Sequence, residues 1–155
     1  MCKTVSVITE NEQQTKKVSA SLTKAISAPA IFAITGQLGA GKTQFVKGLG
    51  EGLNLNSAQI CSASFVVIAE YGQSPTLIHI DAYRLRHPQE LIEIGWDEII
   101  ERNDVIVAIE WAQKISSILP DRRIDVNIEI IEGEKRKITL TAKNGADIPE
   151  HVVLL

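Results

Sequence analysis

The fold of this chain is decided by the stretch Gly36-Gln37-Leu38-Gly39-Ala40-Gly41-Lys42-Thr43. It matches the pattern G-x-x-x-x-G-K-[ST] in full. In this pattern, glycines let the backbone turn so that successive N–H groups point at phosphate oxygens, and the following helix adds the partial positive charge of its N-terminus. The stretch therefore predicts a phosphate-binding loop. The alternative interpretation is a glycine-rich turn that happens to precede a helix.

The segments on either side of the loop favour the first interpretation. Residues 30–35 form a near-continuous apolar run, which is typical of a strand covered on both faces. A helix is predicted over about residues 42–53. A strand, a glycine-rich loop and a helix in this order are the context in which the pattern binds a nucleotide.

The rest of the chain supplies further strands and helices. A capping box at Thr9-Glu10-Asn11-Glu12 predicts a helix that runs to about Ser27, and Pro88 is expected in the first turn of a helix that Gly95 interrupts. Strands are predicted over residues 4–8, 65–71, 76–80, 105–109, 123–131 and 135–141, the second and third as an antiparallel pair and the last two as a hairpin. The sum is an α/β fold, a three-layer P-loop NTPase-like domain with a mixed parallel and antiparallel central sheet that occupies residues 1–155 as a single domain.

Length and composition exclude several other classes. A chain of 155 residues with 45% hydrophobic and 23% charged residues is expected to fold as one compact domain and not to be disordered. No apolar stretch approaches the roughly 20 residues that cross a bilayer, and no signal peptide is apparent, so we expect a cytoplasmic protein without membrane contact. The two cysteines lack metal-ligand spacing and are expected to be reduced thiols.

The charge balance argues against direct binding of nucleic acid. The net charge is −3 and the isoelectric point is near 5.6, whereas a protein that grips phosphate backbones is usually basic. Residues 61–115 are the acidic part, with nine acids against four bases. Most of these acids are interpreted as a solvated helix face.

Two acids of this acidic part, Asp81 and Glu110, directly follow predicted strands. In open α/β sheets, ligands bind outside the carboxyl ends of the strands. Glu110 has the position of a Walker-B carboxylate, which supports Mg²⁺ or its attacking water, and Asp81 is a candidate to hold Mg²⁺ through water or to orient a nucleophile. The alternative for both is an ordinary surface acid at a strand end.

The remaining candidates surround the same ligand. Lys42 is expected to bridge the β- and γ-phosphates, and the Thr43 hydroxyl to complete the coordination of Mg²⁺. Ser64 precedes a predicted strand and is a candidate switch hydroxyl for the γ-phosphate. Trp111 is interpreted either as a core residue or as a neighbour of the nucleotide. His79 is interpreted as a strand histidine with ordinary hydrogen bonds.

The order of these motifs resembles the TsaE (YjeE) family. The resemblance rests on the phosphate loop followed by Ser62-Ala63-Ser64-Phe65, Glu70-Tyr71, His79-Ile80-Asp81-Ala82-Tyr83-Arg84-Leu85 and Ile109-Glu110-Trp111. It covers roughly residues 4–125. Its most specific part is the combination of Asp-x-Tyr-Arg-Leu with this phosphate loop.

The resemblance implies a bacterial P-loop ATPase that binds ATP or ADP with Mg²⁺. Members of the family are needed for threonylcarbamoylation of adenosine 37 in tRNAs that read ANN codons. The modifying chemistry belongs to the partners TsaD and TsaB, with which the ATPase associates, so tRNA is expected to be contacted mainly through those partners. Isolated, the protein is expected to be a monomer.

The resemblance also implies roles for residues. It gives catalytic roles to Asp81, Glu110 and Lys42, and metal binding to Thr43, Glu110 and Asp81. Trp111 matches a tryptophan near the nucleotide, and Thr15 a threonine near the adenine. The residues expected to bind the nucleotide are Gly36, Leu38, Gly39, Ala40, Gly41, Lys42, Thr43, Gln44, Ser64, Thr15 and Trp111.

The chain departs from the family pattern in two places within the site. Ala63 replaces a proline that restrains the loop, and Gln44 replaces a threonine that contacts the α-phosphate, although the backbone N–H remains. No arginine finger is evident, which predicts slow hydrolysis without a partner. A small-molecule kinase stays an alternative, although no arginine-rich lid is evident. A nucleotide-dependent interaction module without essential hydrolysis is another.

Overall fold

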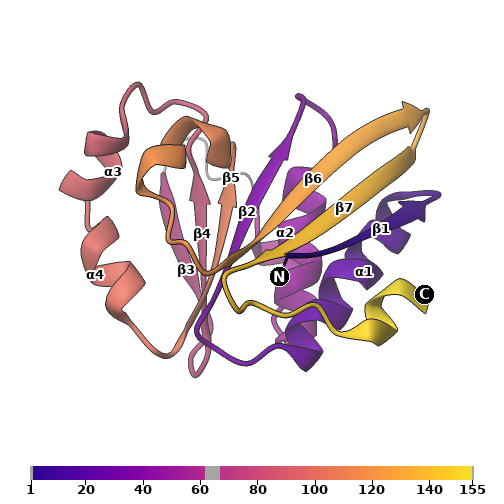
Figure 1. Ribbon diagram of the computed structural model, residues 1–155, viewed down its shortest axis with the longest axis horizontal. Helices are drawn as coiled ribbons and strands as arrows, with labels where there is room; N and C mark the ends of the chain where they lie inside the picture. The colour runs from indigo at the N-terminus through magenta and orange to yellow at the C-terminus, as the bar shows by residue number, and fades with distance from the viewer. Residues whose placement is uncertain (1, 62–66, 155) are drawn as a thin grey trace.

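The computed structural model describes residues 2–61 and 67–154, whose strands form one mixed sheet between helical layers (Figure 1). The strands are β1 Lys3–Thr9, β2 Ala30–Gly36, β3 Ile68–Tyr71, β4 Thr76–Asp81, β5 Val105–Glu110, β6 Arg123–Glu132 and β7 Lys135–Lys143. The α-helices are α1 Glu12–Ala25, α2 Lys42–Gly52, α3 Pro88–Glu93 and α4 Trp96–Glu101. Short 3₁₀ helices are η1 Ser57–Gln59, η2 Ala112–Ile118 and η3 Glu150–Leu154.

The order of the strands across the sheet is β1-β7-β6-β2-β5-β4-β3. The four central strands β6, β2, β5 and β4 are parallel, β3 is antiparallel to β4, and β7 and β1 continue the other side antiparallel. This arrangement confirms the predicted mixed sheet, the antiparallel pair and the hairpin of β6 and β7.

Each face of the central strands packs against its own set of helices, because successive residues of a strand point to opposite faces. On one face, Leu22 of α1 and Phe45 and Leu49 of α2 share a core with Ile106 of β5. On the other face, Leu91 of α3, Trp96 of α4 and Ile115 of η2 share a core with Ile78 and Val107. Figure 1 shows α1 and α2 on one side of the sheet and α3 and α4 on the other.

The contact between α1 and α2 depends on glycine at position 48. A Cβ atom at Gly48 would lie 1.9 Å from the Ser19 Oγ and 2.4 Å from the Lys16 carbonyl oxygen. The same holds one turn later, where a Cβ at Gly52 would lie 2.0 Å from the Thr23 Oγ1. The two helices therefore touch through backbone and small side chains.

The carboxyl ends of the parallel strands β2, β4 and β5 lie at the same end of the sheet. Asp81 and Glu110 are directly paired in the parallel register of β4 and β5, and Ile34 of β2 pairs with Glu110. The glycine-rich loop leaves β2 at this end and leads into α2. The sheet thus brings the phosphate loop and both strand-end carboxylates together.

The start of α1 differs from the sequence prediction. Its N-cap is Asn11, whose Oδ1 accepts a hydrogen bond from the Gln14 N–H at 2.9 Å. Thr9 instead ends β1 and is buried, with its hydroxyl 2.9 Å from the Thr15 hydroxyl. The predicted N-cap at Thr9 is therefore wrong by two residues, because the pairing of β1 with β7 extends through Thr9.

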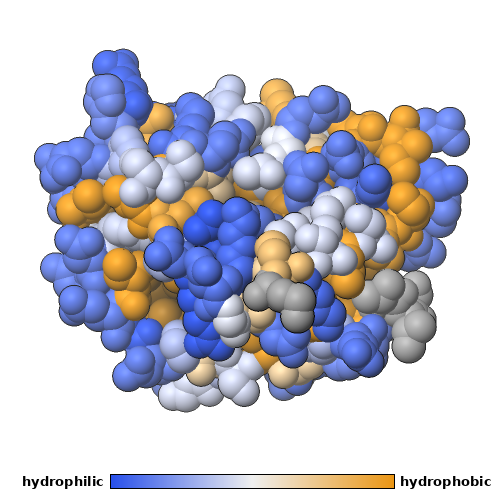
Figure 2. Space-filling model, in the orientation of Figure 1, coloured by the Kyte–Doolittle hydropathy of each residue, from blue (hydrophilic) through white to orange (hydrophobic). Residues whose placement is uncertain are grey.

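The surface in Figure 2 is mostly hydrophilic, with apolar side chains in separate patches. The exposed large apolar side chains belong to different elements, among them Ile8 of β1, Ile100 of α4 and Ile131 of β6. Within residues 2–61 and 67–154, no helix is both long and apolar enough to span a membrane. The predicted strand over 65–71 begins outside the described residues, and its described part is β3.

Candidate functional site

The glycine-rich loop has the backbone conformation that its glycines permit. Gly39 and Gly41 have φ angles of +79° and +102°, a region that residues with a Cβ rarely adopt. Gly41 is the N-cap of α2, and its carbonyl accepts the first helical hydrogen bond from the Phe45 N–H at 3.0 Å. The first N–H groups of α2 have no partners within the helix and are available to an anion.

Lys42 lies across this loop. Its Nζ donates hydrogen bonds to the carbonyl oxygens of Gly36 at 2.7 Å and Gln37 at 2.8 Å, and lies 4.1 Å from the centroid of the Trp111 ring. The residue is only 5% exposed. Burial lowers the pKa of the Lys42 ammonium below its ordinary value, while the negative charges of Glu110 and Asp81 oppose this shift.

Thr43 and Glu110 are in direct contact. The Thr43 Oγ1 lies 2.9 Å from Oε1 and 3.2 Å from Oε2 of Glu110, and donates to this carboxylate. Glu110 ends β5 and is 3% exposed, so its charge faces the loop and not bulk solvent. A hydroxyl and a carboxylate that meet below a phosphate loop are the oxygen ligands that Mg²⁺ prefers.

His79 holds the same carboxylate from the other side. Its Nε2 lies 2.5 Å from the Glu110 Oε2, and the residue is completely buried on β4. Because a carboxylate accepts, the geometry assigns the ring proton to Nε2. The Nδ1 has no hydrogen-bond partner among the described residues. His79 is thus a strand histidine, as predicted, and its hydrogen bond goes to Glu110.

Asp81 lies beside Glu110 at the end of β4. It is 5% exposed, and its Oδ1 accepts a hydrogen bond from the Tyr83 N–H at 3.0 Å. Asp81 also lines the cavity in front of the phosphate loop. Two carboxylates with different hydrogen-bond partners thus share the site.

An aromatic pair covers the site. The rings of Tyr83 and Trp111 are 5.0 Å apart between centroids and tilted by 48°. Trp111 has a φ of +57°, which is uncommon for a residue with a bulky side chain and turns the chain sharply after Glu110. Lys114 donates a hydrogen bond to the Tyr83 carbonyl and lies 5.2 Å from the Tyr83 ring centroid.

These residues enclose a cavity of about 340 Å³. It is within the range of small-molecule and cofactor sites. The residues that line it are Glu12, Leu38, Gly39, Gly41, Lys42, Thr43, Gln44, Asp81, Tyr83, Glu110 and Trp111.

The donor set of this cavity fits Mg²⁺ held together with a nucleotide. Thr43, Glu110 and Asp81 offer oxygen atoms only, and within residues 2–61 and 67–154 no cluster of three or more His, Cys, Asp or Glu side chains could hold a metal by itself. Mg²⁺ is usually bound by one or two protein ligands, waters and substrate phosphates. The site therefore fits a metal that arrives with phosphate.

Not all predicted residues lie in this cavity. Thr15 is 2% exposed, and its hydroxyl is hydrogen-bonded to the Thr9 hydroxyl. It is not among the residues that line the cavity. Gly36 supports the site through its carbonyl, which Lys42 binds, and Ala40 is buried within the loop. Ser64, the predicted switch hydroxyl, lies outside the described residues.

The structure adds residues that sequence reasoning missed. Tyr83 and Glu12 line the cavity, and His79 binds Glu110. The sequence did contain a signal for His79, because it precedes Asp81 by two residues and therefore faces the same side of β4. No comparable signal marks Glu12, which reaches the site only because α1 packs beside α2.

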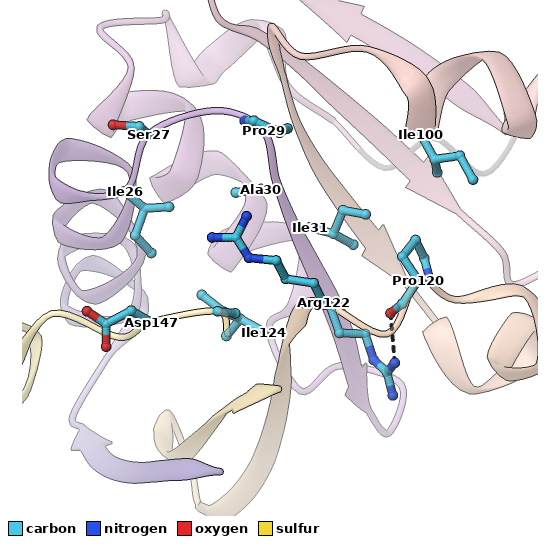
Figure 3. Close-up of a pocket in the computed structure, with 12 residues that line it drawn as sticks. Ile26, Ser27, Pro29, Ala30, Ile31, Ile100, Pro120, Arg122, Ile124 and Asp147 are labelled. Atoms are coloured by element: carbon cyan, nitrogen blue, oxygen red, sulfur yellow. Dashed lines mark hydrogen bonds between the residues drawn. The ribbon is translucent and has the colours of Figure 1, made fainter. Parts of the chain in front are cut away.

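A second cavity, of about 270 Å³, lies at the opposite end of β2 (Figure 3). Its lining is mostly apolar, with Ile26, Pro29 and Ile124, and Figure 3 shows the Arg122 side chain extending toward these residues. None of the predicted site residues lines it. The convergent polar groups therefore favour the cavity at the phosphate loop as the functional site.

Comparisons with known proteins find relatives that match most of the chain. A family described as threonylcarbamoyl adenosine biosynthesis protein TsaE matches residues 9–138. Proteins named tRNA threonylcarbamoyladenosine biosynthesis protein TsaE are similar to the chain, among them those of Bacillus subtilis and Rickettsia felis. That of Bacillus subtilis is 37% identical over 136 residues, which are 86% of this chain and 83% of that protein. That of Rickettsia felis is 34% identical over 131 residues, which are 84% of this chain and 75% of that protein.

A solved structure has the same fold. The crystal structure of Bacillus subtilis YdiB superposes with a TM-score of 0.76 at 31% sequence identity. The superposition covers 93% of this chain and 88% of that one. The likeness therefore extends over nearly the whole chain.

Proposed function

Since the chain belongs to the TsaE family of tRNA threonylcarbamoyladenosine biosynthesis proteins, we propose that it is a slow ATPase that serves this modification. Its P-loop NTPase-like fold is that of a nucleotide-binding protein. The proposal adds hydrolysis of ATP, the requirement for Mg²⁺, and the roles of individual residues.

The contact between Thr43 and Glu110 carries the proposal. A hydroxyl at the start of α2 and a carboxylate at the end of β5 lie 2.9 Å apart, directly below the phosphate loop. When Mg²⁺ is bound, it would neutralise charge on the phosphates, with Thr43 and Glu110 as its protein ligands. Asp81 lies beside them in register and is proposed to hold a metal-bound water or to orient the attacking water.

Lys42 and Trp111 are proposed to respond to the nucleotide. In this structure, Lys42 binds the carbonyl oxygens of Gly36 and Gln37. A phosphate offers this ammonium a full negative charge, so Lys42 would leave the carbonyls and contact the β- and γ-phosphates. Gly39, Gly41 and Gln44 would bind phosphate through backbone N–H groups. The Ala40 N–H donates to the Gln37 carbonyl, so Ala40 would contribute by holding the shape of the loop. Trp111 would then lie beside the phosphates, with Leu38 at the rim of the cavity.

Two further residues belong to the proposal on the family resemblance alone. Ser64 would supply a switch hydroxyl to the γ-phosphate. Thr15 would lie near the adenine, although its hydroxyl is bonded to Thr9.

Partners complete the proposed function. No arginine is among the described residues that line the cavity, so the transition-state charge lacks an arginine finger. We expect slow hydrolysis by the isolated monomer and faster turnover with TsaD and TsaB. The partners carry out threonylcarbamoylation of adenosine 37 in tRNAs that read ANN codons and contact the tRNA. This reaction would place the protein in the cytoplasm.

The test is Mg²⁺-dependent ATP hydrolysis by Thr43→Ala and Glu110→Ala variants. Each removes one proposed metal ligand, so we expect turnover to fall by at least about 100-fold while the far-ultraviolet circular dichroism is unchanged. Glu129→Ala, on the exposed part of β6, is the matched control and should hydrolyse ATP as the unaltered protein does. Undiminished hydrolysis by the Glu110 variant would remove Glu110 from the site.

A further inference from the structure

Arg136, near the start of β7, reaches the phosphate loop. Its Nε lies 2.9 Å from the carbonyl oxygen of Ala40, and its Nη2 lies 3.3 Å from that of Gly39. The two segments are 96 residues apart in sequence. The hairpin of β6 and β7 therefore touches the outer side of the loop that is proposed to bind phosphate.

The other side of the guanidinium is held by the turn of the hairpin. The Arg136 Nη1 donates to the carbonyl oxygens of Gly133 at 2.6 Å and Lys135 at 3.1 Å. An arginine presents five donors in one rigid plane, so a single side chain satisfies the turn and the loop at once. A lysine at this position would offer a point charge without that planar geometry.

These contacts fix the orientation of loop peptides. In a trans peptide, the C=O and the N–H point in opposite directions. With the Ala40 carbonyl turned toward Arg136, the N–H of Gly41 points away from Arg136, and Gly41 is one of the residues that line the cavity. The preceding peptide is fixed as well, because the Gly39 carbonyl accepts from Arg136 while the Ala40 N–H donates to the Gln37 carbonyl at 3.0 Å.

We propose that Arg136 is a positioning residue for phosphate binding, which holds the outer side of the loop so that the Gly41 N–H faces the cavity. The hairpin turn and the loop are thereby coupled through one guanidinium. This inference rests on the proposed function, because it concerns the affinity of the same loop for ATP and ADP. The hydrogen bonds of Arg136 go to carbonyl oxygens of the loop and of the hairpin turn, so we expect its effect to fall on binding and not on the chemical step.

The test compares Arg136→Met and Arg136→Lys with Lys137→Met. Lys137 is the next residue of β7 and is exposed, so its replacement removes one positive charge from the same hairpin and leaves the loop untouched. The dissociation constant of ADP is measured by isothermal titration calorimetry. The KM and kcat for ATP are measured by steady-state hydrolysis. The unfolding temperature of each variant is measured in the absence of nucleotide.

For Arg136→Met we expect the dissociation constant of ADP and the KM for ATP to rise by about 10-fold or more, with kcat within about 3-fold of the unaltered value. Arg136→Lys, which keeps the charge and loses the planar geometry, should be intermediate. Lys137→Met should bind as the unaltered protein does. A merely structural role would lower the unfolding temperature without this rise in KM.

Unchanged ADP affinity in Arg136→Met would overturn the inference. If Arg136→Met does not fold, Arg136→Lys decides, and unchanged affinity there overturns it equally. The proposed function fails in a different way: the unaltered protein would then bind neither ADP nor ATP, or Lys42→Ala would bind them just as well. The two failures are therefore distinguishable in one set of titrations.

Discussion

Glu110 receives hydrogen bonds from two residues that approach it from different elements. Thr43 donates from the start of α2, and His79 donates from β4. A buried carboxylate with both partners in place has a fixed orientation, which is what a metal ligand requires. The precision of the site therefore depends on a histidine that contacts no solvent.

Replacement of His79 should weaken the metal requirement and leave the fold intact. In His79→Leu, Glu110 keeps the Thr43 hydroxyl and loses its other donor, so we expect the Mg²⁺ concentration for half-maximal hydrolysis to rise by about 10-fold. His79→Gln retains a donor and should show a smaller change. The control is His87→Gln, at the exposed start of α3. An unchanged Mg²⁺ requirement in His79→Leu would show that His79 does not position Glu110.

Trp111 should report nucleotide binding. Its ring lies 4.1 Å from the Lys42 Nζ, and this ammonium is expected to move toward phosphate. The other tryptophan, Trp96, is 1% exposed in the core that packs α4 against the sheet. Addition of ADP should therefore change the emission of a Trp96→Phe variant, in which Trp111 remains. The emission of Trp111→Phe should stay constant, and a response from Trp96 alone would contradict the proposed position of the nucleotide.

Part of the site could be predicted from the sequence, because its members are encoded locally. Lys42 and Thr43 belong to a continuous motif, and Glu110 and Asp81 directly follow apolar strands. The contact of Arg136 with Ala40 depends on the pairing of distant strands, so no local pattern contains it.

At the scale of elements, the antiparallel pair of β3 and β4 and the hairpin of β6 and β7 could be predicted from short connections and turn residues. The start of α1 could not, because Thr9 and Asn11 both have side chains suited to an N-cap. Tertiary pairing decides between them: Thr9 is the last residue that pairs with β7, so the helix can begin only after it. Local sequence alone does not contain that information.

The contact between α1 and α2 gives a prediction at this scale. Gly48→Ala adds a methyl group where Ser19 and Lys16 leave no space, so we expect a loss of about 2 kcal/mol in the free energy of unfolding by urea. Alanine is a better helix former than glycine by about 1 kcal/mol. Helix propensity alone would therefore make Gly48→Ala stabilising, so a loss of stability reports the close packing of the two helices. The control Lys47→Ala, one residue away, should change stability by no more than about 0.5 kcal/mol. Stabilisation by Gly48→Ala would show that the helices are less closely packed.

At the scale of the whole molecule, the proposed nucleotide site lies at one end of the central parallel strands. The phosphate loop, both carboxylates and the Arg136 contact all lie at the end of the parallel strands where β2, β4 and β5 stop. The net charge of −3 does not favour an extended grip on a phosphate backbone. In the proposed function, the partners therefore bind the tRNA, and this chain binds and hydrolyses ATP.

The most direct test of this account is reconstitution of tRNA threonylcarbamoylation with TsaB and TsaD. The yield of modified tRNA is compared with this protein, with its Lys42→Ala variant, and without either. The account predicts full modification only with the unaltered protein, and a yield with Lys42→Ala close to that of the reaction without it. Equal yields in all three reactions would contradict the account.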